Sequence, residues 1–327
     1  MHKFITIAGA LAALIAFAAA VAGPAHAQQA YPGKLIRIIV PYAPGASTDS
    51  LARIYGQKMH EAWGQPVIND YKPGGNTIIG SEALTKSAPD GHTMLLVTNT
   101  HSINSQLSKL PYDPIRDFAP VTTIAKTEYM LVVHPSIPAK NLKEFIAFAK
   151  SRPGQLNYSS SGAGGLGHLS GELFNAVAGV KTTHVPFKGG SPSVTALISG
   201  EVQMVFLTPV NVVGHIRAGK VRPLAISGSS RLPALAEVPT FAEAGLPKFE
   251  ATNSYGILMP AGAPRDIIQK VSAELNRIQA LPDVKTKLIA QGLEPYPGSP
   301  EQFAALIKSD MEKFARLIKS ANIKLEN

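Results

Sequence analysis

Two segments of the sequence share one pattern: an apolar strand, a turn of small residues and the start of an amphipathic helix. The first has its strand at 35–40 and its turn at 41–49; the second has them at 156–161 and 162–167. Each turn directs unpaired backbone N–H groups and hydroxyls to one spot over the positive end of a helix, which favours an anion. Two such sites, far apart in the chain, predict two domains that hold one small acid between them.

A binding role is favoured for the first turn because it follows a strand at the end where open α/β sheets bind ligands. Gly45 and Ala46 allow a ligand to approach the backbone closely, while Ser47 and Thr48 can cap the helix. Asp49 is ambiguous, since an acid beside an anion is unfavourable unless it caps the helix or meets a ligand amine or hydroxyl. An ordinary strand–turn–helix is the alternative interpretation.

Further polar residues follow other predicted strands. The run at 98–102 offers several small donors and is otherwise a solvated loop. His101 within it is either a charge-assisted donor or a surface residue. Lys188 can supply a positive charge to a second carboxylate or point to water. Thr208 follows another strand, and Tyr255 can bound a ligand or belong to the core.

The second turn also matches G-x-G-x-x-G at Gly162, Gly164 and Gly167, between a strand and a helix, as in dinucleotide sites. The next strand, 182–186, has no acid to hold a ribose, and an exported protein rarely meets NAD. A carboxylate cradled by N–H groups is therefore favoured, a plain structural turn is the alternative, and no cofactor is expected.

Catalytic and metal-binding signatures are missing from the sequence. The chain has no cysteine, which excludes a disulfide and a thiolate nucleophile. It contains no G-x-S-x-G, P-loop or H-E-x-x-H motif, and His168 and His184 lack an acidic partner at ligand spacing. We expect a protein that is not an enzyme. The rival hypothesis, an exported hydrolase or transferase, requires a nucleophile–base pair that the sequence does not show.

Residues 1–27 have the pattern of a secretory signal peptide, with an uncharged apolar run after Lys3 and an Ala-x-Ala site at 25–27. An uncleaved membrane anchor is the alternative. The chain carries a net charge of +9, but its basic residues are scattered, so nucleic-acid binding is poorly supported. The scattered charge either steers anions toward a cleft or serves solubility.

Strands and helices alternate along the chain, which predicts α/β layers with largely parallel strands. One strand set ends near residue 125 and the other near 250, and 251–259 crosses between them. Amphipathic helices near 264–280 and 300–320 are expected to pack back on the first domain. The predicted division is a signal peptide (1–27), domain 1 (28–127 plus 252–327) and domain 2 (128–251), arranged as a hinged clamshell.

These motifs together resemble the periplasmic substrate-binding proteins of tripartite tricarboxylate transporters, often called Bug-type receptors. The matching runs follow family order over essentially the whole mature chain: Tyr-Pro (31–32), Ile-Ile-Val-Pro-Tyr-Ala-Pro-Gly (38–45) with Asp49, Pro-Gly-Gly (73–75), Ile-Gly (79–80), Ala-Pro-Asp-Gly (88–91), Tyr-Asp-Pro (112–114), Asp-Phe (117–118), Pro-Val (120–121), Leu-Asn-Tyr-Ser-Ser-Ser-Gly (156–162), His-Leu (168–169), His-Val-Pro-Phe-Lys-Gly (184–189), Val-Pro-Thr (238–240), Glu-Ala-Gly (243–245), Tyr-Gly (255–256) and Pro-Ala-Gly (260–262).

The resemblance implies a two-domain periplasmic-binding-protein fold of type II, a Venus flytrap with its ligand cleft between the domains. It implies a small organic acid held by backbone and hydroxyl donors, often with bridging water, and delivered to a membrane permease. Two residues depart from the family pattern. Ala46 stands where the family usually repeats glycine. Ser254 stands where many members have an aromatic residue, and this smaller side chain would open the cleft to a bulkier ligand such as an aromatic acid.

The expected ligand-binding residues are Tyr42, Pro44, Gly45, Ala46, Ser47, Thr48, Asp49, Thr98, Asn99, Thr100, His101, Ser160, Ser161, Gly162, Ala163, Gly164, His168, Lys188, Gly189, Thr208, Ser254 and Tyr255. The expected partners are a di- or tricarboxylate or an aromatic acid, and the transmembrane permease subunits of a tripartite tricarboxylate transporter. A periplasmic monomer without metal or cofactor is expected. A soluble carboxylate sensor is a further hypothesis.

Overall fold

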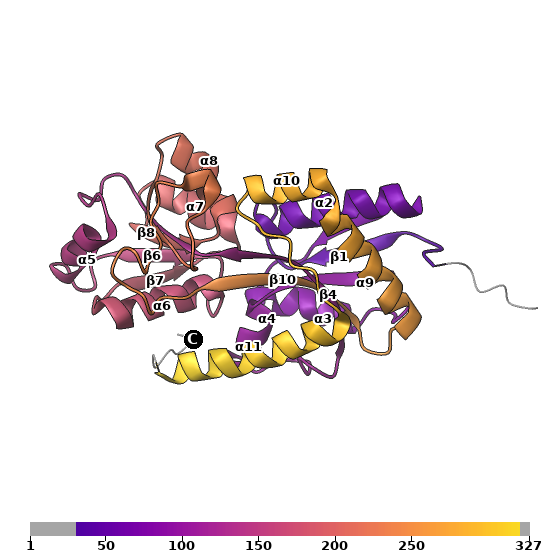
Figure 1. The fold of residues 1–327 in the computed structure, drawn as a ribbon. Helices are drawn as coiled ribbons and strands as arrows, with labels where there is room; N and C mark the ends of the chain where they lie inside the picture. Colours follow the sequence, from indigo (N-terminus) through magenta and orange to yellow (C-terminus); the bar gives the residue numbers. More distant parts are fainter. Residues whose placement is uncertain (1–30, 321–327) are drawn as a thin grey trace, which may run out of the picture. The chain divides into compact units, whose positions relative to one another are not determined.

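Ten strands of the described chain form two five-stranded sheets. The structure is a computed structural model and describes residues 31–320 (Figure 1). The first sheet contains β1 (Ile36–Val40), β2 (Val67–Tyr71), β3 (Thr93–Thr98), β4 (Phe118–Glu128) and β10 (Thr252–Pro260), in the order β2-β1-β3-β10-β4. The second contains β5 (Met130–Val133), β6 (Asn157–Ser160), β7 (Thr183–Pro186), β8 (Met204–Leu207) and β9 (Arg222–Ile226), in the order β7-β6-β8-β5-β9.

Both sheets are mixed, whereas the sequence predicts largely parallel strands. β1 is parallel to β2 and β3, and β6 is parallel to β7 and β8. β10 is antiparallel to β3 and β4, and β5 is antiparallel to β8 and β9. The chain enters these two strands as it passes from one sheet to the other, and each therefore runs against its neighbours. The α/β class is confirmed, and the prediction of parallel pairing is wrong for β5 and β10.

The helices connect these strands, and their bounds are α2 (Ser47–Trp63), α3 (Ile78–Thr85), α4 (Thr100–Leu107), α5 (Leu142–Lys150), α6 (Leu166–Ala178), α7 (Gly190–Ile198), α8 (Pro209–Arg217), α9 (Arg265–Ala280), α10 (Pro282–Ala290) and α11 (Pro300–Ser320), with short 3-10 turns η1 (Gly75–Thr77) and η2 (Pro233–Leu235). The two predicted C-terminal helices correspond to α9 and α11. Sequence reasoning missed α10. The polar run after β3, for which a solvated loop was the alternative, begins α4.

Helix α2 shows why these elements form where they do. Leu51, Tyr55 and Met59 recur every four residues and are buried, so one face of the helix packs on the sheet. The helix ends at Gly64, whose φ of 68° is left-handed and whose N–H donates to the carbonyl of His60 at 2.9 Å. The N-terminus of α2 lies after the carboxyl end of β1, and the first predicted turn connects the two.

Helix α11 contributes to the cores of both sheets. Phe303, Ile307 and Met311 belong to the apolar cluster around β1, β3 and β10. Phe314 belongs to the cluster around β5, β6 and β8, and Ile318 packs against it. Figure 1 shows α11 alongside α4, with its far end toward α6. The sequence predicts packing on the first domain and does not predict the contact with the second core. The predicted leader, 1–27, lies outside the described residues, within which no helix is long and apolar enough to cross a membrane.

Candidate ligand-binding site

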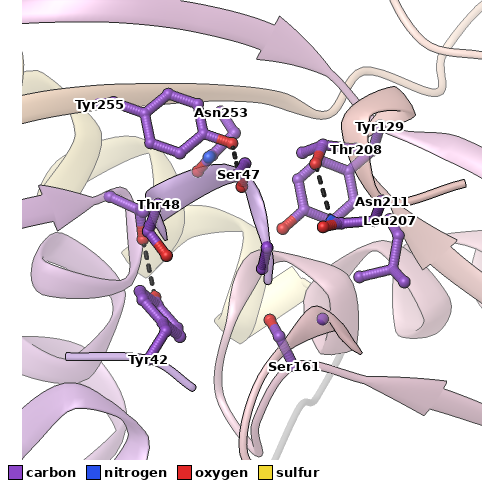
Figure 2. Close-up of a pocket in the computed structure, with 13 residues that line it drawn as sticks. Tyr42, Ser47, Thr48, Tyr129, Ser161, Leu207, Thr208, Asn211, Asn253 and Tyr255 are labelled. Carbon is purple, nitrogen blue, oxygen red and sulfur yellow. Dashed lines mark hydrogen bonds between the residues drawn. The ribbon is translucent and has the colours of Figure 1, made fainter. Parts of the chain in front are cut away.

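Elements of both sheets line a small cavity of about 30 Å³, called the inner cavity below (Figure 2). Its residues are Tyr42, Ala46, Ser47, Thr48, Thr98, Asn253 and Tyr255 from the first sheet and its helices, Tyr129 from the link between β4 and β5, and Ser161, Gly190, Leu207, Thr208 and Asn211 from the second sheet and its helices. None of these thirteen residues is charged. The volume admits about two water-sized groups, which matches the two oxygens of one carboxylate.

Hydroxyl groups dominate the inner cavity. The Tyr42 hydroxyl lies 2.9 Å from Thr98 Oγ1, and Tyr255 donates to Ser47 Oγ at 2.9 Å. Figure 2 shows the pair formed by Tyr255 and Ser47. The hydroxyl of Thr48 is buried and has no hydrogen-bond partner within the described residues. Because a buried polar group without a partner is costly, the Thr48 hydroxyl is a candidate donor to a polar ligand.

Three helices begin at the inner cavity. The residues before α2, α7 and α8 are Ala46, Gly189 and Thr208, and none of them caps its helix through a side chain. The first N–H groups of a helix have no partner within the helix, and its N-terminus carries a partial positive charge. The cavity thus combines three positive helix ends with neutral hydroxyl donors, an arrangement that stabilises an anion without a cation.

Three tyrosines at the cavity remain neutral. Burial raises the pKa of Tyr42, although its hydrogen bonds to threonine oppose the shift. Burial, assisted by the neighbouring Tyr255 and Tyr42, raises the pKa of Tyr129 well above its ordinary value. Burial raises the pKa of Tyr255 to about 12. Since a neutral phenol carries no charge that would repel a carboxylate, these side chains are compatible with an anionic ligand over the physiological pH range.

The tyrosine shifts predict how stability and acid binding respond to alkaline pH. The neutral phenol of Tyr255 favours the folded state, so its contribution to stability is fully present below pH about 10, the unfolded pKa, and is lost as the pH rises through about 12. Affinity for a carboxylate should be constant from pH about 7 to 9. Calorimetric titration from pH about 7 to 9 measures the affinity. Denaturant unfolding from pH about 9 to 12 measures the stability. A fall in affinity below pH about 9 would show that a group other than these tyrosines controls binding.

The sequence of the chain matches a known receptor family. Residues 51–323 match the tripartite tricarboxylate transporter family receptor. The chain belongs to this family. The receptor is 32% identical to Protein BugT of Bordetella pertussis over 311 residues, which cover 94% of this chain and 95% of BugT. This confirms the resemblance drawn from the motifs and places the chain in a family of binding proteins, which are not enzymes.

Solved structures agree with this assignment. A structure described as a periplasmic transporter has a TM-score of 0.88 and 39% identity, covering 91% of the receptor and 100% of that chain. The structure of R. palustris Rpa4515 with adipate has a TM-score of 0.88 and 31% identity, and the match covers 90% of the receptor and 99% of that chain. The structure of MatC from Rhodopseudomonas palustris with bound malate has a TM-score of 0.84 and 31% identity, and the match covers 88% of the receptor and 100% of that chain. The expected periplasmic-binding-protein fold is confirmed.

The structure brings part of the expected binding set together in this receptor. The expected residues that line the inner cavity are Tyr42, Ala46, Ser47, Thr48, Thr98, Ser161, Thr208 and Tyr255. A second cavity of about 260 Å³, called the outer cavity, shares Tyr42 and Ser161 with the inner one. Its other residues are the expected Gly162, Ala163 and Lys188, together with Pro41, Gly74, Gly75, Asn76, Thr77, Pro186 and Phe187. The remaining expected residues line neither cavity: Pro44, Gly45, Asp49, Asn99, Thr100, His101, Ser160, Gly164, His168, Gly189 and Ser254.

Asp49 supports the first turn and does not face the inner cavity. Its carboxylate accepts hydrogen bonds from the Gly45 N–H at 2.8 Å, from Arg53 Nε at 2.7 Å and from the Tyr71 hydroxyl. Burial by itself would raise the pKa of Asp49, but the bonds from Tyr71, Gly45 and Arg53 hold it below its ordinary value. The ambiguity over an acid beside an anion site is thereby explained, because this charge is already paired.

Two expected histidines take part in the internal structure of the receptor. The His101 ring is buried, with Nε2 2.8 Å from the carbonyl of Pro114 and an edge-to-face contact with Phe118. Burial lowers the pKa of His101, so it is neutral and is not the charged donor considered from the sequence. His168 accepts the Gly164 N–H at 3.0 Å on Nδ1 and shapes the second turn.

Other expected residues hold the backbone near the cavities. Ser160 accepts the Gly162 N–H at 3.2 Å, and its hydroxyl lies 2.7 Å from His184 Nε2. Asn99 accepts the Ser254 N–H at 2.5 Å through Oδ1, and its Nδ2 donates to Asp310 at 3.0 Å. These residues position the turns beside the two cavities.

Sequence reasoning missed Tyr129, Gly190, Leu207, Asn211 and Asn253 in the inner cavity. The alternation of side chains along a strand could have found Asn253, since residues two apart on a strand share a face. Asn253 and Tyr255 both line the cavity, and Ser254 between them does not. The expected widening of the cleft at Ser254 therefore gains no support from the inner cavity.

Proposed function

We infer that this receptor captures a small organic carboxylate in the inner cavity and delivers it to the permease subunits of a tripartite tricarboxylate transporter. The observation that carries this function is the uncharged inner cavity at three helix N-termini, with the buried Thr48 hydroxyl left without a partner. The relatives with adipate and with malate support a carboxylate ligand. The relative described as a periplasmic transporter supports action in the periplasm after export by the leader.

Capture works by closure of two domains, each built around one of the two sheets. Domain 1 comprises 28–127 plus 252–327, and domain 2 comprises 128–251. The inner cavity exists only where residues of both meet, so a bound acid favours the closed form through contacts that the open form lacks. Closure also removes water, which strengthens each hydrogen bond to the carboxylate. One such charge-assisted bond contributes about 1.5–3 kcal/mol. The receptor acts as a monomer, since the chain itself supplies both sides of the cavity.

A thermal-shift screen of residues 28–327 tests the proposed function. The panel contains succinate, glutarate, adipate, malate, citrate, amino acids, benzoate and phthalate, with the corresponding amides as controls for charge. A carboxylic acid should raise the unfolding temperature in a saturable manner, and its amide should not. Absence of any stabilisation by an acid, in protein unfolded and refolded to remove a carried ligand, would contradict the proposed function.

A further inference from the structure

The chain crosses between the two sheets at two places that lie side by side. The first crossing runs from Glu128, the last residue of β4, through Tyr129 into β5. The second enters β10 at its first residue, Thr252, which is paired with Glu128 across the antiparallel ladder of β4 and β10. Since a hinge consists of a few residues at the ends of such elements, a rotation of one sheet against the other changes the contacts at these crossings.

The carboxylate of Glu128 lies at the crossings and accepts hydrogen bonds from two hydroxyls. Thr252 Oγ1 donates to its two oxygens at 2.9 and 3.0 Å, and Ser227 Oγ donates to Oε2 at 2.7 Å. Burial raises the pKa of Glu128, and these two hydrogen bonds oppose the shift. The charged side chains Lys126 and Glu294 also affect it, but they pair with each other at 3.3 Å. The two hydroxyls therefore stabilise the charge of Glu128 inside the protein.

The two hydroxyls belong to different sheets. Thr252 lies in the first sheet with Glu128, whereas Ser227 is buried directly after β9 of the second sheet. Ser227 is attached to Tyr129 by two hydrogen bonds: its Oγ accepts the Tyr129 N–H at 3.0 Å, and its own N–H donates to the Tyr129 carbonyl at 2.8 Å. Gly228 allows the close approach, because a Cβ there would lie 2.9 Å from Glu128 Cγ. The bond from Ser227 to Glu128 therefore joins the second sheet to the first.

The crossings also reach the inner cavity. Tyr129 follows Glu128 in the chain, Asn253 follows Thr252, and both line this cavity. Glu128 and Ser227 line neither the inner nor the outer cavity. The bond from Ser227 to Glu128 is thus present in the same arrangement of the sheets that forms the inner cavity, but it lies outside the space for a ligand.

We propose that Glu128 is a positioning residue for capture, because the hydrogen bond from Ser227 to its carboxylate stabilises the closed form and is lost when the sheets rotate apart. This inference rests on the proposed function. Ser227 moves with the second sheet, so its bond to Glu128 depends on closure, whereas the bond from Thr252 lies within the first sheet and persists. A contact made only in the closed form raises the population of that form and hence the affinity for the acid. It slows release of the acid and leaves capture unchanged, since the acid enters the open form.

The test measures association and dissociation rates by stopped-flow tyrosine fluorescence, with the acid of the thermal-shift panel that binds the unmodified receptor most tightly. Ser227→Ala should raise the dissociation rate about threefold to thirtyfold and leave the association rate within about twofold. The effect is limited because Ser227 Oγ also lies 2.8 Å from the carbonyl of Ala251, which accepts its proton in the open form. Thr252→Val is the matched control: it removes the other hydroxyl bond to Glu128, so it should lower the unfolding temperature and leave both rates within about twofold.

A double-mutant cycle assigns the effect to the bond itself. Glu128→Gln should also raise the dissociation rate, since it removes the charge that Ser227 stabilises. Adding Ser227→Ala to Glu128→Gln should raise it by less than about twofold more, because both changes remove one interaction.

The outcomes separate this role from the proposed function. An unchanged dissociation rate in Ser227→Ala, an equal rise in Ser227→Ala and Thr252→Val, or effects that multiply in the double variant would overturn the role of Glu128, while binding of the acid would still support the proposed function. If no acid of the panel binds the unmodified receptor, the proposed function fails and this inference fails with it. Thermal unfolding establishes that each variant is folded; if Ser227→Ala is not, Glu128→Gln is compared with Thr252→Val in its place.

Discussion

Gly45→Val is expected to weaken binding of the receptor's acid at least about tenfold, which corresponds to about 1.4 kcal/mol. A Cβ at Gly45 would lie 2.9 Å from Ser191 Oγ, which belongs to α7 beside the second sheet. The larger valine side chain would therefore obstruct the closed form in particular. The φ of +91° at Gly45 also strains any residue with a side chain, and valine most of all. Calorimetric titration with the acid identified by the screen measures the loss.

A matched control separates obstruction from strain. Gly64 also has a left-handed φ, +68°, but a Cβ there would meet nothing within 4 Å. Because of the backbone strain alone, Gly64→Val should lower the free energy of unfolding by about 1–3 kcal/mol. Its affinity for the acid should stay within about twofold of the unmodified receptor. Adding Ser191→Gly to Gly45→Val should restore part of the affinity. Unchanged binding by Gly45→Val would show that closure at Ser191 plays no part in capture.

Thr48→Val is expected to weaken acid binding about tenfold to a hundredfold while leaving the fold intact. The Thr48 hydroxyl is buried and makes no hydrogen bond within the described residues, so the free receptor loses nothing when valine replaces it. The complex loses a charge-assisted bond of about 1.5–3 kcal/mol. Calorimetry gives the affinity, and denaturant unfolding of the free receptor gives the stability.

Thr122→Val provides the opposite pattern as a control. Thr122 is equally buried, but its hydroxyl donates to the carbonyl of Gly298 at 2.7 Å, away from both cavities. This variant should lose about 1–3 kcal/mol of unfolding free energy and retain its affinity. If Thr48→Val instead lost stability and retained affinity, the Thr48 hydroxyl would be a structural group, and the anion site would lie elsewhere.

Local sequence patterns predict the parts of the site that one strand–turn–helix segment creates. Ser47 and Thr48 follow β1 at the start of α2, and their position at a helix N-terminus already indicates an anion site. Tyr129 and Asn211 could not be found in this way, because they reach the cavity only when the two sheets meet. Asn76 lines the outer cavity with a left-handed φ of 48° and is held by Asn104, which is twenty-eight residues away in sequence.

The same reasoning explains the errors in the predicted fold. Periodicity indicates where a strand lies but not its direction, so the antiparallel placement of β10 follows from a chain crossing that no local pattern records. His101 looks like an exposed donor in sequence because it lies in a polar run. In the structure α4 begins there and turns its ring toward Phe118, so tertiary packing decides the role of this residue.

A crystal structure of residues 28–327 with the acid found in the screen tests the central claim most directly. We predict one carboxylate of that acid in the inner cavity, with an oxygen about 2.5–2.9 Å from Thr48 Oγ1 and hydrogen bonds from the first N–H groups of α2 and α7. A ligand bound outside the inner cavity, or bound there through an uncharged group with its carboxylate in solvent, would contradict the account.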